Sequence, residues 1–106
     1  MMIAKIYKQV SVYINEGDEW KHRPLHLEIL SMLFREGMSG GTVLRGVAGF
    51  TGAEGVHSTS LVDAGGKLPL VVHFIDTEEN VQRVLPLLRE MTKHRLITVQ
   101  SVELIP

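Results

Sequence analysis

The sequence predicts an α+β fold in which two helices lie on one face of a four-stranded antiparallel sheet. Two segments place apolar residues at helical spacing, and four others have the alternating or continuously apolar character of strands. In chain order these segments read strand, helix, strand, strand, helix, strand. At 106 residues the chain has room for one domain, which we take as residues 1–106.

The first half of the chain supplies one strand and one helix. Residues 3–14 alternate apolar and polar side chains apart from Lys8, which predicts a strand, and residues 15–20 form a polar turn. Pro24 suits the first turn of a helix, and Gly37 suits its C-terminal cap. The apolar residues between them follow helical spacing: Leu25, Ile29, Leu30, Met32, Leu33 and Phe34.

Two strands and a long loop are predicted next. Residues 42–48 read as a strand, in which Gly46 indicates a bulge or a close backbone approach. Residues 51–68 show neither period, and a gap of that length is usually a functional or mobile loop. Residues 70–75 form a short apolar run that is typical of a buried strand.

The second helix is predicted to begin at Asp76-Thr77-Glu78-Glu79, which offers capping groups with a carboxylate three residues on. Its apolar positions are Val81, Val84, Leu85, Leu88 and Met91. Pro86 lies among them, so we expect a kink or a solvent-facing defect rather than a break. Residues 96–105 form the last strand and complete the β-α-β-β-α-β, or ferredoxin-like, order.

This arrangement leaves one face of the sheet without helices. Tyr7 and Tyr13 would lie on that face, and a surface of mixed aromatic and aliphatic character is commonly covered by another subunit. We therefore expect an oligomer.

Composition excludes several classes of function. The 11 Lys and Arg nearly balance the 12 Asp and Glu, so no net field favours nucleic acid or an anionic membrane as a partner. The absence of cysteine excludes disulfides, thiolate catalysis and Cys-ligated metals. The opening residues form no signal peptide and no stretch is apolar enough to insert in a membrane, so a cytoplasmic protein is expected, and no cofactor is indicated.

Seven of the ten glycines lie between Gly37 and His57, which marks this segment as the candidate functional region. Within it, Gly49-Phe50-Thr51-Gly52 can present backbone N–H groups to an anion, and Phe50 can stack on a base. The alternative is a glycine-rich bulge with Phe50 in the core.

Four further residues have both a binding and a structural interpretation. Arg45 interrupts an apolar strand, so it either binds phosphate or carboxylate or pairs with an acidic residue across a subunit interface. His57 and Ser58 are polar groups suited to a ligand cleft, or simply solvated loop residues. Trp20 precedes a helix N-terminus, where anions bind, but it can equally pack against the first helical turn.

Metal binding and catalysis receive little support from the residues. His22 and His26 are four apart on an expected helix, yet no third ligand is suitably spaced, which favours chance placement. His73 is interpreted as a satisfied core or interface histidine. No pattern of nucleophile and base is present, so we predict no enzyme activity and no catalytic residues.

Several separated motifs agree in order and spacing with one family. The stretch GMSGGTVLRGVAGF, from Gly37 to Phe50, follows Asp18-Glu19-Trp20 and precedes His57-Ser58. Leu68-Pro69-Leu70-Val71-Val72 and the helix start at Asp76 come further on. Over essentially its whole length the chain resembles the small, uncharacterised prokaryotic proteins of domain of unknown function 190, which are described as PII-like.

The resemblance implies a ferredoxin-like subunit in a homotrimer, with ligand sites in the clefts between subunits. PII signalling proteins bind adenine nucleotides there and use a long loop after the second strand to contact a partner. Thr51 stands where PII proteins carry a further glycine. The Gly- and Lys-rich phosphate loop of PII proteins has no counterpart, because the chain reads Met91-Thr92-Lys93-His94-Arg95 there, which leaves an adenosine or monophosphate-like ligand open.

From this resemblance we expect a PII-like signalling or regulatory protein that binds a small anionic ligand, an adenine nucleotide, in inter-subunit clefts. Its signal would pass through the loop of residues 51–68. The resemblance also suggests a membrane transport protein such as a fluoride channel as the regulated partner, since relatives are often encoded beside one. The rivals are a divalent-metal-binding trimer resembling the cation-tolerance proteins and an enzyme with a cleft active site.

Overall fold

A single four-stranded antiparallel sheet forms the framework of the molecule. The computed structural model describes residues 5–50, 57–58 and 68–106. The strands follow the spatial order β4–β7–β1–β8, and each pair of neighbours is antiparallel. Their bounds are β1 Lys5–Asn15, β4 Thr42–Arg45, β7 Pro69–Asp76 and β8 Leu96–Leu104. This is the predicted β-α-β-β-α-β order, with the two helices in the two crossovers.

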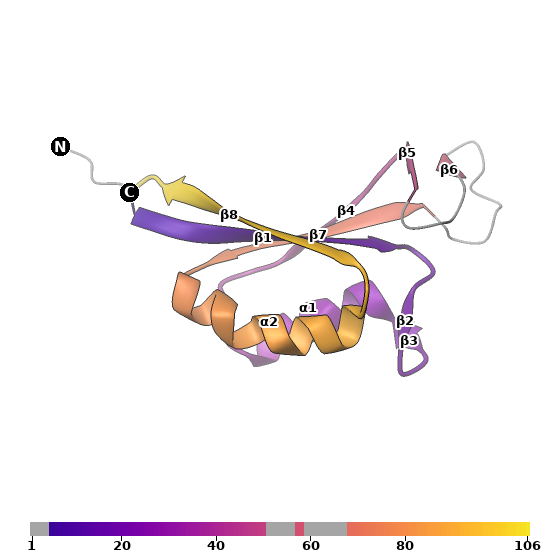
Figure 1. The fold of residues 1–106 in the computed structure, drawn as a ribbon, viewed down its shortest axis with the longest axis horizontal. Coiled ribbons are helices and arrows are strands. Elements are labelled where there is room, and N and C mark those ends of the chain that lie inside the picture. Colours follow the sequence, from indigo (N-terminus) through magenta and orange to yellow (C-terminus); the bar gives the residue numbers. More distant parts are fainter. Residues whose placement is uncertain (1–4, 51–56, 59–67) are drawn as a thin grey trace.

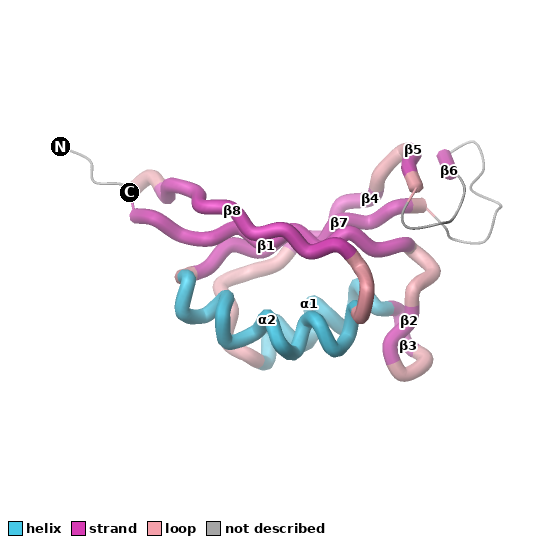
Figure 2. Tube along the Cα trace, viewed as in Figure 1, coloured by secondary structure: helices cyan, strands magenta, loops and turns pink. Residues whose placement is uncertain are grey.

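Both helices cover the same face of the sheet, and the other face carries no helix (Figures 1 and 2). They are α1, Leu25–Arg35, and α2, Glu78–Thr92. Apolar side chains of the helices and the sheet form one core, whose fully buried members are Val10, Val12, Ile14, Ile29, Leu33, Val72, Val81, Val84 and Leu88. No helix in the described part of the chain is long and apolar enough to cross a bilayer.

The end of α1 confirms the capping role expected for Gly37. Gly37 has a φ of +76°, and its N–H donates to the Phe34 carbonyl at 3.1 Å. The Met38 N–H donates to the Leu33 carbonyl at 3.0 Å, which completes a Schellman motif. The turn directs the chain from the helix toward β4.

The start of α2 differs in detail from the prediction. Thr77 is the N-cap, and its hydroxyl accepts from the N–H of Asn80, so no carboxylate occupies the third helical position. The acidic group acts one residue earlier: buried Asp76 accepts from the N–H of Thr77, the side-chain amide of Asn80, and both the N–H and hydroxyl of Ser39. Pro86 lies on the exposed side of α2, and the helix continues through it as expected.

The strand predicted over residues 42–48 is wrong in its second half. β4 ends at Arg45, because the next partner on β7 is Pro69: its carbonyl accepts from the Gly46 N–H at 2.8 Å, but proline has no N–H to return a hydrogen bond. A Cβ on Gly46 would lie only 2.8 Å from Pro69 Cγ, so the expected close backbone approach is confirmed. The chain then forms β5, Ala48–Gly49, which pairs with β6, His57–Ser58.

A short hairpin replaces the simple polar turn predicted before α1. Its strands are β2, Glu19–Trp20, and β3, Arg23–Pro24. The two-residue loop between them, Lys21-His22, has positive φ values of 52° and 66°. Sequence reasoning missed it because this loop lacks the Asn-Gly or Asp-Gly residues that normally mark such turns.

Candidate functional site

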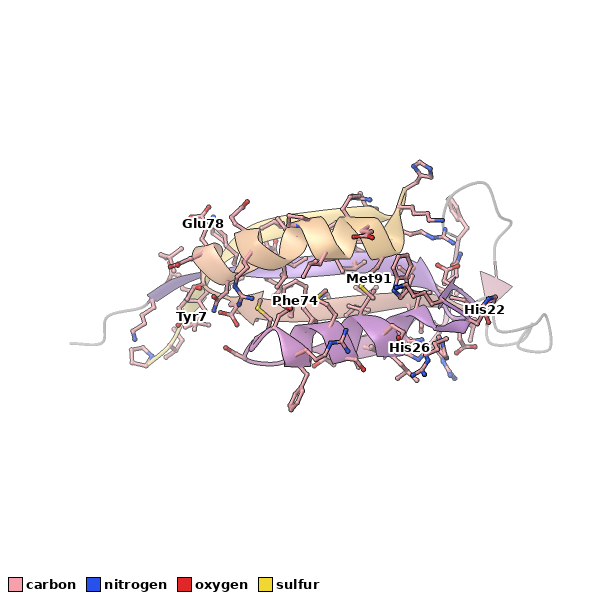
Figure 3. All side chains as sticks on the ribbon, turned by 90° about the horizontal axis from the view of Figure 1, so that it is seen from below. Tyr7, His22, His26, Phe74, Glu78 and Met91 are labelled. Carbon is pink, nitrogen blue, oxygen red and sulfur yellow. The ribbon has the colours of Figure 1, made fainter. Side chains whose placement is uncertain are left out.

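A groove of about 1000 Å³ lies at one end of the sheet. Four segments line it, together with Tyr13 of β1 and Leu25 of α1: residues 18–21 at the hairpin, 46 and 48–50 after β4, 69–71 at the start of β7, and 91–96 between α2 and β8. The groove therefore unites segments that are far apart in the sequence. Figure 3 shows His22 at this end of the molecule, opposite the end that carries Tyr7 and Glu78.

Three of the predicted site residues line this groove: Trp20, Gly49 and Phe50. Trp20 is half-buried and packs against the core, as its structural interpretation predicts, while also facing the groove. Phe50 is 66% exposed, so it is not the core residue of the alternative interpretation. Two aromatic side chains and a glycine backbone thus border one cavity.

The other predicted site residues have different positions. The Arg45 guanidinium lies 2.6 Å from the Glu16 carboxylate, so its acidic partner belongs to the same chain, and Arg45 does not line the groove. His57 and Ser58 form β6, in which His57 is paired with Gly49 of the groove wall. Thr51 and Gly52 lie outside the described residues.

Glycines bring the main chain of this wall close to Pro69. A Cβ on Gly49 would lie 3.1 Å from Pro69 Cγ, and a Cβ on Gly46 would lie closer still. Because the Gly46 N–H already donates to Pro69, that amide does not bind a ligand. The bare backbone of this wall serves close packing at Gly46 and borders the groove at Gly49.

Two turns with the same three residues flank the groove. Lys21-His22-Arg23 begins in the hairpin loop, and Lys93-His94-Arg95 joins α2 to β8. Of the 11 Lys and Arg in a chain with net charge −1, these tripeptides hold Lys21, Arg23, Lys93 and Arg95. Sequence reasoning did not assign these residues to the site, although the repeated tripeptide is the signal that could have done so.

An ion pair connects the two turns. Arg95 Nη2 lies 2.7 Å from Asp18 Oδ1, and both side chains are largely buried. Asp18 also fixes the hairpin, because Oδ2 accepts from the Asn15 N–H and its carbonyl accepts from the Leu25 N–H. On the other turn, the Arg89 guanidinium donates to the Lys93 and Arg95 carbonyls. The two basic turns are therefore held in place by their own internal contacts.

The histidines form no metal centre in the described part of the chain. No three His, Asp or Glu side chains gather there in a way that could hold a metal ion. His22 lies in the hairpin loop and His26 on α1, so the expectation that both share one helix is wrong. His73 is half-buried on the open face, where its Nδ1 is 2.9 Å from Ser11 Oγ, so its ring has the hydrogen-bond partner expected of a satisfied histidine.

The structure has the ferredoxin-like α+β fold, and solved PII-like proteins share it. CPII of Thiomonas intermedia K12, a nitrogen regulatory PII-like protein, superimposes with a TM-score of 0.73 at 16% identity over 98% of this chain and 92% of that one. A putative PII-like signalling protein of Thermus thermophilus gives a TM-score of 0.61 at 21% identity, over 97% and 91% of the chains.

The chain belongs to the DUF190 family, described as "Uncharacterized ACR, COG1993", whose model matches residues 7–104. Two members of this family are more similar to the chain in sequence than the solved structures are. A UPF0166 protein of Methanocaldococcus jannaschii is 38% identical over 94 residues, covering 89% of this chain and 83% of that protein. A UPF0166 protein of Aquifex aeolicus is 30% identical over 99 residues, covering 92% of each.

Proposed function

We propose that this is a cytoplasmic PII-like signalling protein that binds a small anionic ligand, an adenine nucleotide, in clefts between the subunits of a homotrimer. Ligand binding alters the segment of residues 51–68, which contacts the regulated partner. The proposed ligand-binding residues are Trp20, Arg45, Gly49, Phe50, Thr51, Gly52, His57 and Ser58.

The observation that carries the proposal is the lining of the groove. Trp20 and Phe50 offer two aromatic surfaces, and a base stacked on an aromatic ring gains about 1–3 kcal/mol. Lys21, Lys93 and His94 add positive or ionisable groups at the same cavity. Its volume of about 1000 Å³ accommodates a nucleotide-sized ligand.

The position of the groove supports a site shared between subunits. One row across the open face of the sheet consists of Leu44, Val71, Tyr13 and Leu96, in register with one another. Leu44 and Leu96 are 52% and 59% exposed, so a covering subunit would bury substantial apolar surface. Tyr13, Val71 and Leu96 also line the groove, so a subunit on this face would add a wall to it.

The structural neighbours supply the ligand class by analogy. CPII structures are described as bound to ADP and bicarbonate, in two cases with AMP as well. The β5–β6 pair joins His57, within the 51–68 segment, to Gly49 of the groove wall, so the segment is connected to the proposed site. A membrane transport protein such as a fluoride channel is the proposed partner on the family resemblance alone.

Calorimetric titration with AMP, ADP, ATP and bicarbonate tests the ligand class, with Zn²⁺ and Mg²⁺ titrated alone for the metal-binding rival. We expect at least one adenine nucleotide to bind and Phe50→Ala to weaken it about tenfold, through loss of stacking. Phe34→Ala is the matched control, since Phe34 is 85% exposed on α1 outside the groove. Response to metals without any response to nucleotides would contradict the proposal.

Two further measurements test assembly and the absence of turnover. Sedimentation at micromolar concentration is expected to give a trimer, and a monomer would refute the shared cleft. Incubation with ATP is expected to release no phosphate, whereas steady release would favour the enzyme alternative. Co-purification with a membrane transport protein, with and without ADP, addresses the partner.

A further inference from the structure

Two complementary surfaces lie at the end of the sheet opposite the groove. One is the ribbon, formed by residues 5–7 of β1 and 102–104 of β8. The other is the α1 pocket, formed by the last two turns of α1 and residues 38–41. We propose that this end of the molecule binds the same end of a second copy of the chain, so that the ribbon of each copy occupies the α1 pocket of the other.

The ribbon projects beyond the rest of the fold. β7 ends at Asp76, which pairs with Lys8, so among the described residues the ribbon strands pair only with each other. Figures 1 and 2 show the start of β1 and the end of β8 reaching past both helices. Ile6 and Glu103 are directly paired on the helix side of the sheet, and Ile6 is 61% exposed there. Because a two-stranded ribbon is marginally stable in water without packing on its faces, this favours a partner.

The α1 pocket is apolar with one charge at its margin. It has a volume of about 630 Å³, and Leu30, Phe34 and Met38 supply apolar walls. Phe34 is 85% exposed, more than any other large apolar residue that the structure describes. Arg35 is the charged residue among those that line the pocket. Aromatic residues, methionine and arginine are enriched in protein interfaces, and here they fit an apolar side chain with an acid beside it.

The ribbon presents that combination in Ile6 and Glu103. The side chains of Glu103 and Arg35 make no ion pair or hydrogen bond with any residue that the structure describes. Lys8, on the same side of the ribbon, donates instead to Ser101 Oγ at 2.8 Å. One acidic and one basic group therefore remain available, one on each surface, and complementary charges fix the register of such a contact.

The two surfaces lie close together on one copy. Ser39 of the α1 pocket donates its N–H to Asp76 at 2.8 Å, and Asp76 pairs with Lys8, two residues from Ile6. Two such surfaces side by side match the same pair on a second copy in reverse order, so a two-fold contact uses both and closes on itself. The contact leaves the groove accessible, because the groove lies at the other end (Figure 3). It doubles whatever unit the subunits form, and the trimer of the proposed function becomes a hexamer.

Sedimentation equilibrium of the full chain, over about 1 to 100 µM, tests the contact. We expect the wild type to double its subunit number as the concentration rises. Arg35→Glu and Glu103→Arg should each weaken this association at least tenfold, because like charges then face each other, and the double variant should recover most of the loss. Ile6→Ser should weaken it as well, through lost apolar burial. Glu90→Arg is the control, since Glu90 is exposed on α2 and does not line the α1 pocket.

Circular dichroism and melting temperature verify that each variant is folded. A wild type that does not double, doubling that persists in Arg35→Glu and Glu103→Arg, or a double variant without recovery overturns the inference. Calorimetry with nucleotides on the same samples keeps the two proposals apart. A wild type that binds a nucleotide but does not double refutes this contact alone, whereas one that doubles but binds no nucleotide refutes the proposed function alone.

Discussion

Polar side chains at the two ends of the sheet differ in whether they have hydrogen-bond partners within the chain. At the end where β7 meets α2, the carboxylate of Asp76 is buried and accepts hydrogen bonds from Ser39, Thr77 and Asn80. At the groove end, Lys93 and His94 have no such partners among the residues described, and the backbone beneath them has positive φ at Lys93. Figure 3 shows the two ends, with Glu78 beside the first and His22 at the second.

The difference separates residues that stabilise the fold from residues available for binding. A buried polar group that is hydrogen-bonded within the chain, as Asp76 is, contributes to stability. Free cations on strained backbone contribute little to stability, and natural proteins retain such features chiefly at functional sites. Substitution of Asp76 should therefore change unfolding, and substitutions at the groove end should change binding.

The largest effect is expected at Asp76. Asp76→Ala removes the acceptor of four part-buried hydrogen bonds and leaves their donors without it, so the free energy of unfolding should fall by about 2–4 kcal/mol. Urea denaturation measures this change. Glu36→Ala breaks the exposed Arg83–Glu36 pair and serves as the control, with a loss below about 1 kcal/mol. Equal losses in the two variants would contradict the comparison.

Acid should weaken the same end of the molecule. Burial raises the pKa of Asp76, but hydrogen bonds from Asn80, Ser39 and Thr77 outweigh burial and hold the pKa at about 2, below its ordinary 3.8. The ionised carboxylate therefore stabilises the fold fully above pH 3.8, and this contribution is lost as the pH falls through about 2. This lowering of the Asp76 pKa corresponds to about 2 kcal/mol in the free energy of unfolding.

Urea denaturation at pH 5 and at pH 2.5 tests the acid effect. Most of the Asp76 contribution should disappear between these two values, and Asp76→Asn should show a correspondingly smaller difference between them. A wild type and a variant with the same pH dependence would show that Asp76 is not the group responsible.

The sequence predicted the helices and the sheet better than the groove. Apolar spacing located α1 and α2, because their burial is set by residues three or four apart in one segment. Gly37 is predictable as a cap because a glycine directly after a helix readily adopts the positive φ that ends it. These features depend on neighbours in sequence, which a single chain displays directly.

The missed features depend on contacts between distant segments. The early end of β4 follows from Pro69, which meets Gly46 from a strand more than twenty residues away. No residue near Lys21 in the sequence indicates that its turn will lie at the same cavity as Lys93. The Asp18–Arg95 ion pair brings the two segments together, and its members are 77 positions apart. Trp20, Gly49 and Phe50, which the sequence analysis assigns to a ligand site, line one cavity, but the sequence analysis assigns no role there to the basic turns beside it.

Gly46 offers a sharper test of the groove wall. In Gly46→Ala the added Cβ meets Pro69 Cγ at 2.8 Å, so we expect a loss of about 1–2 kcal/mol in the free energy of unfolding and a displaced groove. Adding Pro69→Ala should recover part of the loss, since the ring atom in contact is removed. Gly40→Ala is the control, because no atom lies within 4 Å of its Cβ position and φ is not positive. A neutral Gly46→Ala would show that the close approach is not a constraint.

The smallest effect should have the opposite sign and arise at the groove end. His22 occupies the second position of a two-residue hairpin loop with a φ of 66°, where glycine is the preferred residue. His22→Gly should therefore raise the free energy of unfolding by about 0.5–1 kcal/mol, even though it deletes a side chain. Urea denaturation measures the gain, with His94→Gly as a matched histidine deletion, since His94 has no positive φ.

Nucleotide binding should also be measured on His22→Gly. Because His22 does not line the groove and Lys21 is retained, adenine-nucleotide affinity should be unchanged in His22→Gly while the free energy of unfolding rises. If the free energy of unfolding instead falls, histidine at position 22 stabilises the hairpin. The positive φ at this position then costs the fold no stability. The difference between the two ends of the sheet would then depend on Lys21 and Lys93 alone and not on backbone strain.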